Sequence, residues 1–245
     1  MKIYGQTDKG IVRDNNQDSF RIETKGGLTL GIVCDGMGGA AGGSTASNTA
    51  CDAFIQKVFA DISTNSNQVL IPDILERAVK YANDIVYTLS REKAELTGMG
   101  TTLCAILTDG KKMWAVSVGD SRIYMFNKGE MTQLSHDHSY VQALIDCGAI
   151  TKEEGRTHPQ KNIITRAVGT SPDIDCDNYM LDEIPDGILL CSDGLTNYVT
   201  DSELKNVFCQ YSDNEELFVS TLVAMANSEG GGDNITVLVM LSDNS

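Results

Sequence analysis

Four aspartates stand where an apolar run meets glycine: Asp35, Asp120, Asp193 and Asp233. Taken singly, an Asp-Gly pair beside a strand is typical of a hairpin turn. Four such sites at the ends of buried strands indicate more, because stacked sheets can bring strand ends together. Glycine beside each carboxylate also permits close approach of the backbone or of an ion. The pattern therefore predicts an acidic cluster at one edge of the fold.

Several carboxylates in one cleft would not all stay ionised unaided, and divalent cations would relieve their repulsion. The ligands would be hard oxygens, which favour Mg²⁺ or Mn²⁺. His136 and His138 form the one close histidine pair, and their spacing is weak evidence for zinc. Two ions about 3.5–4 Å apart can share a water, lower its pKa and direct it at phosphorus. We therefore expect two such ions per site.

The stretch Arg-Asp-Asn-Asn-Gln-Asp near the start adds Arg13 and Asp18. An isolated arginine is usually a solvated surface residue. Beside a metal centre, however, its guanidinium forks naturally onto phosphate oxygens. The sequence thus supplies a candidate phosphate clamp next to the candidate metal ligands.

A different reading of the first glycine-rich turn is a dinucleotide-binding loop, with Gly36, Gly38 and Ala41 in a G-x-G-x-x-A pattern. Asp35 would then place a carboxylate beside the pyrophosphate, and no second strand ends in an acid about 20 residues on. The sequence contains neither a C-x₅-R pattern nor a P-loop, which argues against cysteine-based phosphatase chemistry and against a P-loop ATPase.

The elements that must position these residues are strands and helices of mixed order. Strand-like runs lie at 2–6, 18–23, 28–34, 101–108, 112–118, 121–127, 187–192 and 235–241. Helical patterns lie at 43–60, 72–96, 138–147, 200–210 and 214–227. Two adjacent helices inside a β-rich order argue against a βαβ repeat and favour antiparallel sheets with helices on their outer faces.

Two connections receive specific predictions. Residues 101–127 form three apolar runs separated by Asp-Gly-Lys-Lys and Gly-Asp, which predicts a meander of adjacent antiparallel strands. Residues 62–71 are the most polar break, and we expect a loop between helices there.

Composition narrows the class of protein. The 245 residues are 41% hydrophobic with a net charge of −15, so we expect one globular domain over 1–245 that binds neither nucleic acid nor anionic membrane. Seven cysteines, an odd number without a C-x-x-C pair, predict a reduced, cytoplasmic protein. No apolar stretch approaches the ~20 residues of a membrane span, and the start lacks a secretion signal.

Eight motifs in order resemble the protein phosphatase 2C family of metal-dependent Ser/Thr phosphatases: RDNNQD, VCDGMGG, GMGTT, VGDSR, LSHDHS, ITRAVG, CSDGL and GGDNITV. The resemblance runs from Arg13 to Val237 and is closest to compact bacterial members. It implies an α+β fold, a four-layer αββα sandwich of two stacked antiparallel sheets flanked by helices. Residues 139–168 are similar to the flap beside the cleft of these enzymes.

The resemblance also implies roles for individual residues. Asp35 would bridge two metals, Gly36 would offer its carbonyl, and Asp193 and Asp233 would complete the site. The remaining implied contributors are Asp18, near the metals through water; Asp120, a ligand of a third, weaker metal shared with Asp193; and Ser192 and Asn234, which would support the cluster. Arg13, Asp35 and Asp193 are the expected catalytic residues.

One departure concerns the general acid. Relatives carry a histidine in the DGMGGH or DGHGG loop, whereas this chain has Met37 and Ala40 there. The leaving oxygen would then take its proton from a water on a metal or from His136, His138 or His158.

The implied function is direct hydrolysis of phosphoserine and phosphothreonine in proteins, without a phosphoenzyme, by an activated water. We expect phosphorylated proteins as partners, a cognate bacterial Ser/Thr kinase acting in opposition, and a monomer. The alternative is a phosphoprotein-binding module that has lost catalysis, although all five carboxylates of the metal motifs are present.

Overall fold

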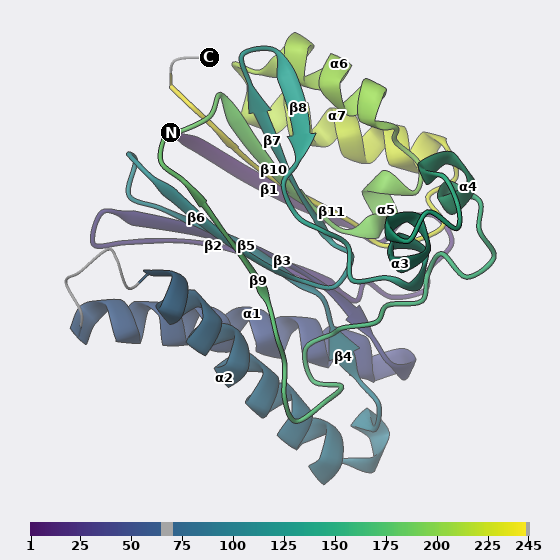
Figure 1. Ribbon diagram of the computed structural model, residues 1–245. Helices are drawn as coiled ribbons and strands as arrows, with labels where there is room; N and C mark the ends of the chain where they lie inside the picture. Colours follow the sequence, from purple (N-terminus) through teal and green to yellow (C-terminus); the bar gives the residue numbers. More distant parts are fainter. Residues whose placement is uncertain (65–70, 244–245) are drawn as a thin grey trace.

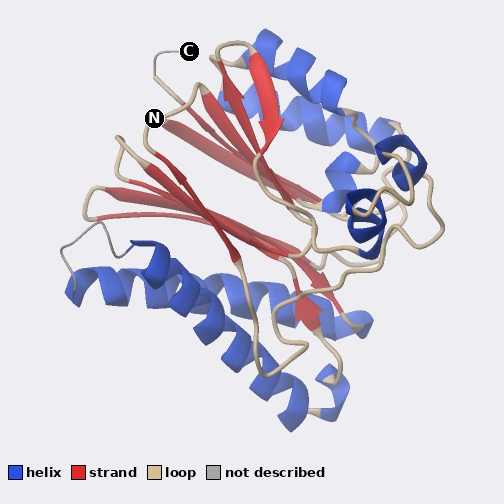
Figure 2. Ribbon diagram, in the orientation of Figure 1, coloured by secondary structure: helices blue, strands red, loops and turns tan. Residues whose placement is uncertain are grey.

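The computed structural model describes residues 1–64 and 71–243. Two antiparallel sheets lie face to face, and helices cover both outer faces (Figure 1 and Figure 2). This confirms the predicted α+β architecture of four layers. Apolar side chains from both sheets fill the space between them. Nearly every central strand is therefore buried on both of its faces.

The first sheet has the order β2-β3-β5-β6-β9, with the short β4 paired to β3. Its strands are β2 (Asp18–Lys25), β3 (Leu28–Met37), β4 (Gly100–Thr101), β5 (Leu103–Thr108), β6 (Met113–Val118) and β9 (Asp177–Leu181). The helices α1 (Gly39–Thr64) and α2 (Ile71–Glu92), followed by a 3₁₀ turn at Ala94–Leu96, cover its outer face.

The second sheet has the order β1-β11-β10-β7-β8. Its strands are β1 (Lys2–Asp8), β7 (Arg122–Asn127), β8 (Glu130–Gln133), β10 (Gly187–Cys191) and β11 (Ile235–Leu241). The helices α6 (Asp201–Tyr211) and α7 (Glu215–Ser228) cover its outer face. Three short helices, α3 (Tyr140–Asp146), α4 (Lys152–Arg156) and α5 (Asp193–Thr196), lie at one end of the stack.

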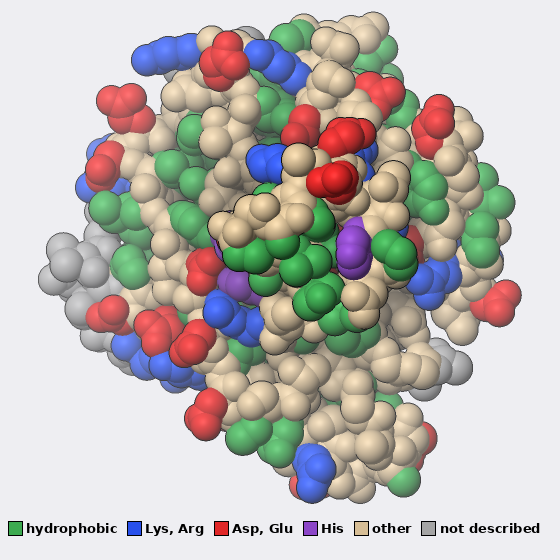
Figure 3. Space-filling view, turned by 45° about the vertical axis from the view of Figure 1, so that its right-hand side comes forward, with side chains coloured by type: hydrophobic (Ala, Val, Ile, Leu, Met, Phe, Trp, Pro, Cys, Tyr) green, Lys and Arg blue, Asp and Glu red, His purple; other side chains and the backbone are tan. Residues whose placement is uncertain are grey.

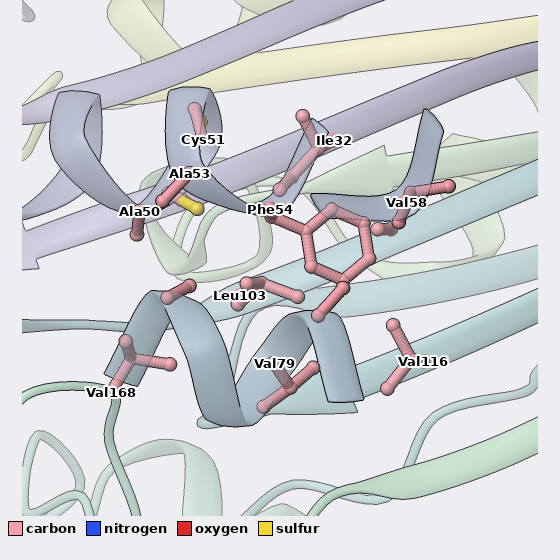
Figure 4. Close-up of a cluster of buried hydrophobic side chains, with 14 of the residues drawn as sticks. Ile32, Ala50, Cys51, Ala53, Phe54, Val58, Val79, Leu103, Val116 and Val168 are labelled. Atoms are coloured by element: carbon pink, nitrogen blue, oxygen red, sulfur yellow. The ribbon is translucent and has the colours of Figure 1, made fainter. Parts of the chain in front are cut away.

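Alternation along the strands sorts side chains between layers. On β3, Val33 points between the sheets, whereas Ile32 faces the helices. There Phe54 of α1 and Val79 of α2 pack over the sheet (Figure 4). Burying each of these large apolar side chains stabilises the fold by about 1.5–3 kcal/mol, so the packing holds β3 against α1 and α2.

The predicted meander over 101–127 is half wrong. β5 and β6 pair as expected, with Leu103 opposite Val118. β7 instead joins the other sheet, where Arg122 lies opposite Cys191. Its run is buried on both faces, and such a pattern fits either sheet equally well. The Gly119–Asp120 pair is therefore a crossover between sheets and not a hairpin turn.

Other differences are smaller. The edge strands β8 and β9 were not predicted, because they are short and only half-buried. Of the predicted loop over 62–71, residues 62–64 belong to α1 and Ile71 begins α2, while 65–70 lie outside the described residues. The dinucleotide alternative is contradicted, because α2 is the next described element after α1 and both sheets are antiparallel. None of the described helices has the length and apolar character that a bilayer crossing requires.

Candidate active site

The acidic residues converge because four strand ends meet at the same end of the sandwich. Asp18 opens β2 and lies directly opposite Asp35, near the end of β3. In the other sheet, Asp193 follows β10 and Asp233 precedes β11, and the two strands are antiparallel neighbours. A hydrogen bond from the Ser192 amide to the Thr236 carbonyl, 3.0 Å long, continues that pairing beyond β10.

The connection from β6 to β7 crosses from one sheet to the other and carries the fifth carboxylate. Asp120 lies between the end of β6 and the start of β7 and is 8% exposed. It lines a cleft of about 540 Å³ together with Asp35, Asp193 and Asp233. Asp18 does not line this cleft and lies buried behind it. The structure thus brings together the residues that the sequence had spread over more than 200 positions.

The glycine after Asp35 has a packing reason in addition to its proposed chemical one. A Cβ on Gly36 would lie 2.1 Å from the Gly43 carbonyl oxygen and 2.6 Å from that of Gln17. The Gly36 amide also donates to the Gln17 carbonyl at 3.2 Å. A side chain here would force α1 away from β3, so the bare turn lets the helix start beside the acidic cluster. Gly36 lines the cleft as well.

Burial and mutual repulsion dominate the electrostatics of the cluster. Burial, followed by the negative charges of Asp18 and Asp193, raises the pKa of Asp35 well above its usual range. Burial also raises the pKa of Asp18 to about 7, against the hydrogen bonds that it accepts. The pKa values of Asp120 and Asp193 are raised as well, first by burial and then by a neighbouring carboxylate. Without a cation, the cluster resists full ionisation.

Several carboxylate oxygens of the cluster have no hydrogen-bond partner that the structure describes, as expected of cation ligands. Among the described residues, five buried side-chain oxygen atoms have no hydrogen-bond partner, and three of them are Oδ1 of Asp18, Asp120 and Asp193. Native proteins rarely leave such groups unpaired unless an ion or water occupies the site. No three His, Cys, Asp or Glu side chains in the described part form a closed metal cage. Mg²⁺ and Mn²⁺ sites need none, because waters and carbonyls complete their coordination.

Arg13 lies at the rim of the cleft and is already paired. Its Nη2 donates to Asp233 Oδ2 at 2.8 Å, and its side chain is 50% exposed. Its Nε donates to the Gly232 carbonyl at 3.3 Å. These contacts hold the guanidinium beside the carboxylates with one edge toward solvent, as a group that meets an incoming phosphate would be.

Polar side chains fix the acids from behind. Ser192 Oγ donates to Asp18 Oδ2 at 2.7 Å. The Asn234 backbone amide donates to Asp233 Oδ1 at 2.9 Å. Its side chain binds backbone groups: Oδ1 accepts from the Gln17 amide at 2.8 Å, and Nδ2 donates to the carbonyls of Lys9 and Asn15. Asn234 therefore holds the segment that carries Arg13 and Asp18.

One supporting residue, Asn197, was not predicted from the sequence. Asn197 Nδ2 donates to Asp193 Oδ2 at 3.0 Å, and Lys161 Nζ donates to Asn197 Oδ1 at 2.8 Å. The signal was available, because Asn197 stands four residues after Asp193 in a stretch that begins a helix.

Comparison with known proteins identifies the family. The family model described as Protein phosphatase 2C matches residues 10–230. The serine/threonine phosphatase stp of Listeria monocytogenes is 34% identical, over 99% of this chain and 96% of that protein. Protein phosphatase PhpP of Streptococcus pneumoniae is 37% identical, over 98% and 97%.

The chain belongs to the protein phosphatase 2C family. The crystal structure of Stp1 from Staphylococcus aureus superposes with a TM-score of 0.90 at 33% identity, covering 99% of this chain and 95% of that one. The catalytic domain of PstP, solved with two manganese ions, gives a TM-score of 0.83 at 32% identity, over 97% and 96%. The predicted activity class is confirmed: this member of the family is a protein serine/threonine phosphatase.

Within the described residues, none of the three histidines lines the cleft of this phosphatase, although His136 lines an adjoining cavity. His136 pairs with Asp146 at the surface, and His158 Nδ1 accepts from the Gln160 amide. His138 is buried and hydrogen-bonded. The described lining of the cleft therefore offers no histidine as the general acid.

A second cavity of about 380 Å³ adjoins the cleft, and both are lined by Asp120 and Asp193. The segment 139–168 covers it, with α3 and α4 contributing Val141, Ile145 and Lys152. Figure 3 turns this side of the molecule toward the viewer, and hydrophobic and histidine side chains are visible at its surface. The predicted flap segment thus lies beside the cleft.

Proposed function

We propose that this phosphatase removes phosphate from serine and threonine side chains of proteins in the acidic cleft, with two Mn²⁺ or Mg²⁺ ions as cofactors. The observation that carries the proposal is the set of buried, unpartnered carboxylate oxygens of Asp18, Asp120 and Asp193 at one end of the sandwich. The two manganese ions of the PstP catalytic domain support the same number here.

The oxygen donors divide into groups. Asp35, the Gly36 carbonyl, Asp193 and Asp233 would hold the two ions, with Asp18 behind them. Asp120, which borders both cavities with Asp193, would serve a third, weaker site. When bound, such ions act as Lewis acids and lower the pKa of water, so that water attacks phosphorus directly.

The protein's own groups handle the substrate. Arg13 would exchange part of its contact with Asp233 for the phosphoryl oxygens, since a guanidinium binds phosphate in a fork. Asn197 and Ser192 hold Asp193 and Asp18 in one orientation, so little reorganisation accompanies binding. Arg13, Asp35 and Asp193 are the residues that we propose as catalytic.

We also propose where the protein acts, how it assembles and what it acts on. Seven cysteines, all free thiols, support a cytoplasmic location. One chain supplies all five carboxylates of the cluster, so the proposed site needs no second subunit, and we propose a monomer. The relatives' serine/threonine phosphatase names support phosphoproteins as partners and a cognate Ser/Thr kinase in opposition.

The test is turnover with defined metal. Purified protein is stripped with EDTA, dialysed, and assayed on p-nitrophenyl phosphate and on a phosphothreonine peptide, with Mn²⁺, Mg²⁺ or Ca²⁺ added back. We expect phosphate release with Mn²⁺ or Mg²⁺ and its loss on renewed EDTA. Binding of the phosphopeptide without release under any of these metals would contradict the proposal and indicate a binding module.

A further inference from the structure

The motif His136-Asp137-His138 has no part in the proposed chemistry, yet its second histidine is tied to the cluster. His138 is 8% exposed and meets Gly119, the residue before Asp120, twice. Its backbone amide donates to the Gly119 carbonyl at 2.8 Å. Its ring Nδ1 accepts from the Gly119 amide at 3.0 Å. Both backbone hydrogen-bonding groups of Gly119 are therefore satisfied by one residue.

The ring has a defined proton. Because the Gly119 amide donates to Nδ1, the neutral imidazole carries its proton on Nε2. Nε2 lies 3.2 Å from Asp177 Oδ2, to which it donates. With Nε2 protonated, Arg166 Nη1, which lies 2.8 Å from it, makes no hydrogen bond to the ring and donates instead to Asp177 Oδ1 at 3.3 Å. Burial, and then the charge of Arg166, lowers the pKa of His138, so the ring stays neutral and Nδ1 stays an acceptor.

The crossover is confined from the opposite side as well. Gly119 has φ +98°, and a Cβ there would lie 2.7 Å from Thr102 Cγ2. Thr102 Oγ1 in turn accepts from the Asp35 amide at 2.8 Å and hydrogen-bonds with Ser121 Oγ at 2.6 Å. The turn that carries Asp120 is thus wedged between the residue that holds Asp35 and the ring of His138.

The same histidine closes the base of the segment 139–168. Its carbonyl accepts from the Thr165 amide at 2.8 Å, and the next residue, Ser139, forms a β-bridge with Ile164. Ile164 lines the cleft. His138 therefore stands where the crossover and the two ends of the segment meet.

We propose that His138 is a positioning residue, which fixes Asp120 in the cleft through its two hydrogen bonds to Gly119. This rests on the proposed function, in which Asp120 is a metal ligand. A buried histidine could instead serve packing alone. The two roles differ in what they require: packing needs the volume of the ring, whereas positioning needs an acceptor at the place of Nδ1.

Two substitutions separate these roles. In His138→Asn, the side-chain Oδ1 occupies the place of Nδ1 on the same Cγ and keeps an acceptor for Gly119, although it loses the contact with Asp177. In His138→Leu, apolar volume is kept and the acceptor is lost. We measure Mn²⁺ affinity by isothermal titration calorimetry, and kcat/KM on p-nitrophenyl phosphate, with circular dichroism to verify folding.

We expect His138→Leu to weaken Mn²⁺ binding and lower kcat/KM by about 10–100-fold, the range for groups that orient metal ligands. We expect His138→Asn to stay within about threefold of wild type in both measurements. Equal losses in the two variants, or no loss in the folded Leu variant, would overturn the proposal.

A double-mutant cycle with Asp120→Asn tests the route of action. If His138 acts through Asp120, His138→Leu should add little in the Asp120→Asn background, and the two losses should not add. Additive losses would contradict positioning through Asp120. Wild-type protein that releases no phosphate with any metal would instead disprove the proposed function itself, so the two failures are distinguishable.

Discussion

Two aspartates, equally buried and 17 positions apart, have opposite surroundings. Asp137 is 7% exposed, and both of its carboxylate oxygens accept hydrogen bonds from Arg122, at 2.7–3.1 Å. Gln133 donates to it as well, at 2.8 Å. Asp120 is 8% exposed, and its Oδ1 has no partner among the described residues. Burial alone therefore does not distinguish a structural acid from a functional one.

The difference lies in where each charge is used. The charge of Asp137 is neutralised within the protein, because its carboxylate pairs with the largely buried guanidinium of Arg122. Asp120 faces Asp193 and other carboxylates, and burial together with that charge raises its pKa. A buried acid kept among acids destabilises the protein unless a cation arrives, which is typical of a site built for binding.

The largest effect should come from the functional side of this comparison. Asp193→Asn removes a charge from the metal site, and we expect kcat/KM for p-nitrophenyl phosphate with saturating Mn²⁺ to fall by about 10³-fold or more. The reason is that a metal's Lewis-acid contribution amounts to several kcal/mol, and each 1.36 kcal/mol is tenfold in rate. The folded state should survive, because Asn can keep the contact with Asn197. Unchanged Mn²⁺-dependent turnover would mean that the role of Asp193 is misassigned.

The structural side should show the reverse. Asp137→Ala leaves the Arg122 guanidinium without its carboxylate, and we expect the free energy of unfolding to fall by about 3 kcal/mol. For a chain of this size, the melting temperature should drop by roughly 6–12 °C. Turnover per folded molecule should change only a few-fold. Asp146→Ala, at an exposed carboxylate that also accepts hydrogen bonds, is the matched control and should melt close to wild type.

Sequence alone predicted which acidic residues converge better than it predicted the elements around them. Asp35 and Asp193 could be placed because each ends a continuous apolar run, and motif order supplied their neighbours. The sheet to which β7 belongs could not be predicted, because a strand buried on both faces has no hydrophobic pattern that distinguishes one sheet from the other. His138 could not be given a role either, since its function depends on a glycine 19 positions away that only the fold brings within 3.0 Å.

Asp137 illustrates the same limit. In the sequence it is one more aspartate in a polar stretch, as Asp120 is one more Asp beside glycine. The residue that distinguishes the two aspartates is Arg122, which pairs with Asp137. It can do so because β7 lies in the second sheet with β8 beside it. Whether an acid is paired is a property of tertiary contacts, and residue types and spacing do not report it.

The smallest effect concerns stability without metal. The pKa of Asp18 is about 7 in the fold against 3.8 ordinarily, so the folded state holds more protons than the unfolded chain between these values. Stability must therefore fall as pH rises through that range. In EDTA, we expect the melting temperature to be a few degrees lower at pH 8 than at pH 6.5. The lowered pKa of His138 acts below 6.5 and does not interfere.

Asp18→Asn is the control, and it should reduce this slope, because one titrating group is gone while the other carboxylates with raised pKa values remain. Added Mn²⁺ should stabilise wild type more at pH 8 than at pH 6.5, since ligation requires the ionised carboxylates. The melting temperature of Asp137→Ala, by contrast, should keep the wild-type slope in EDTA, because the acidic cluster is intact. A slope that is lost in Asp137→Ala and is undiminished in Asp18→Asn would reverse the assignment of structural and functional acids.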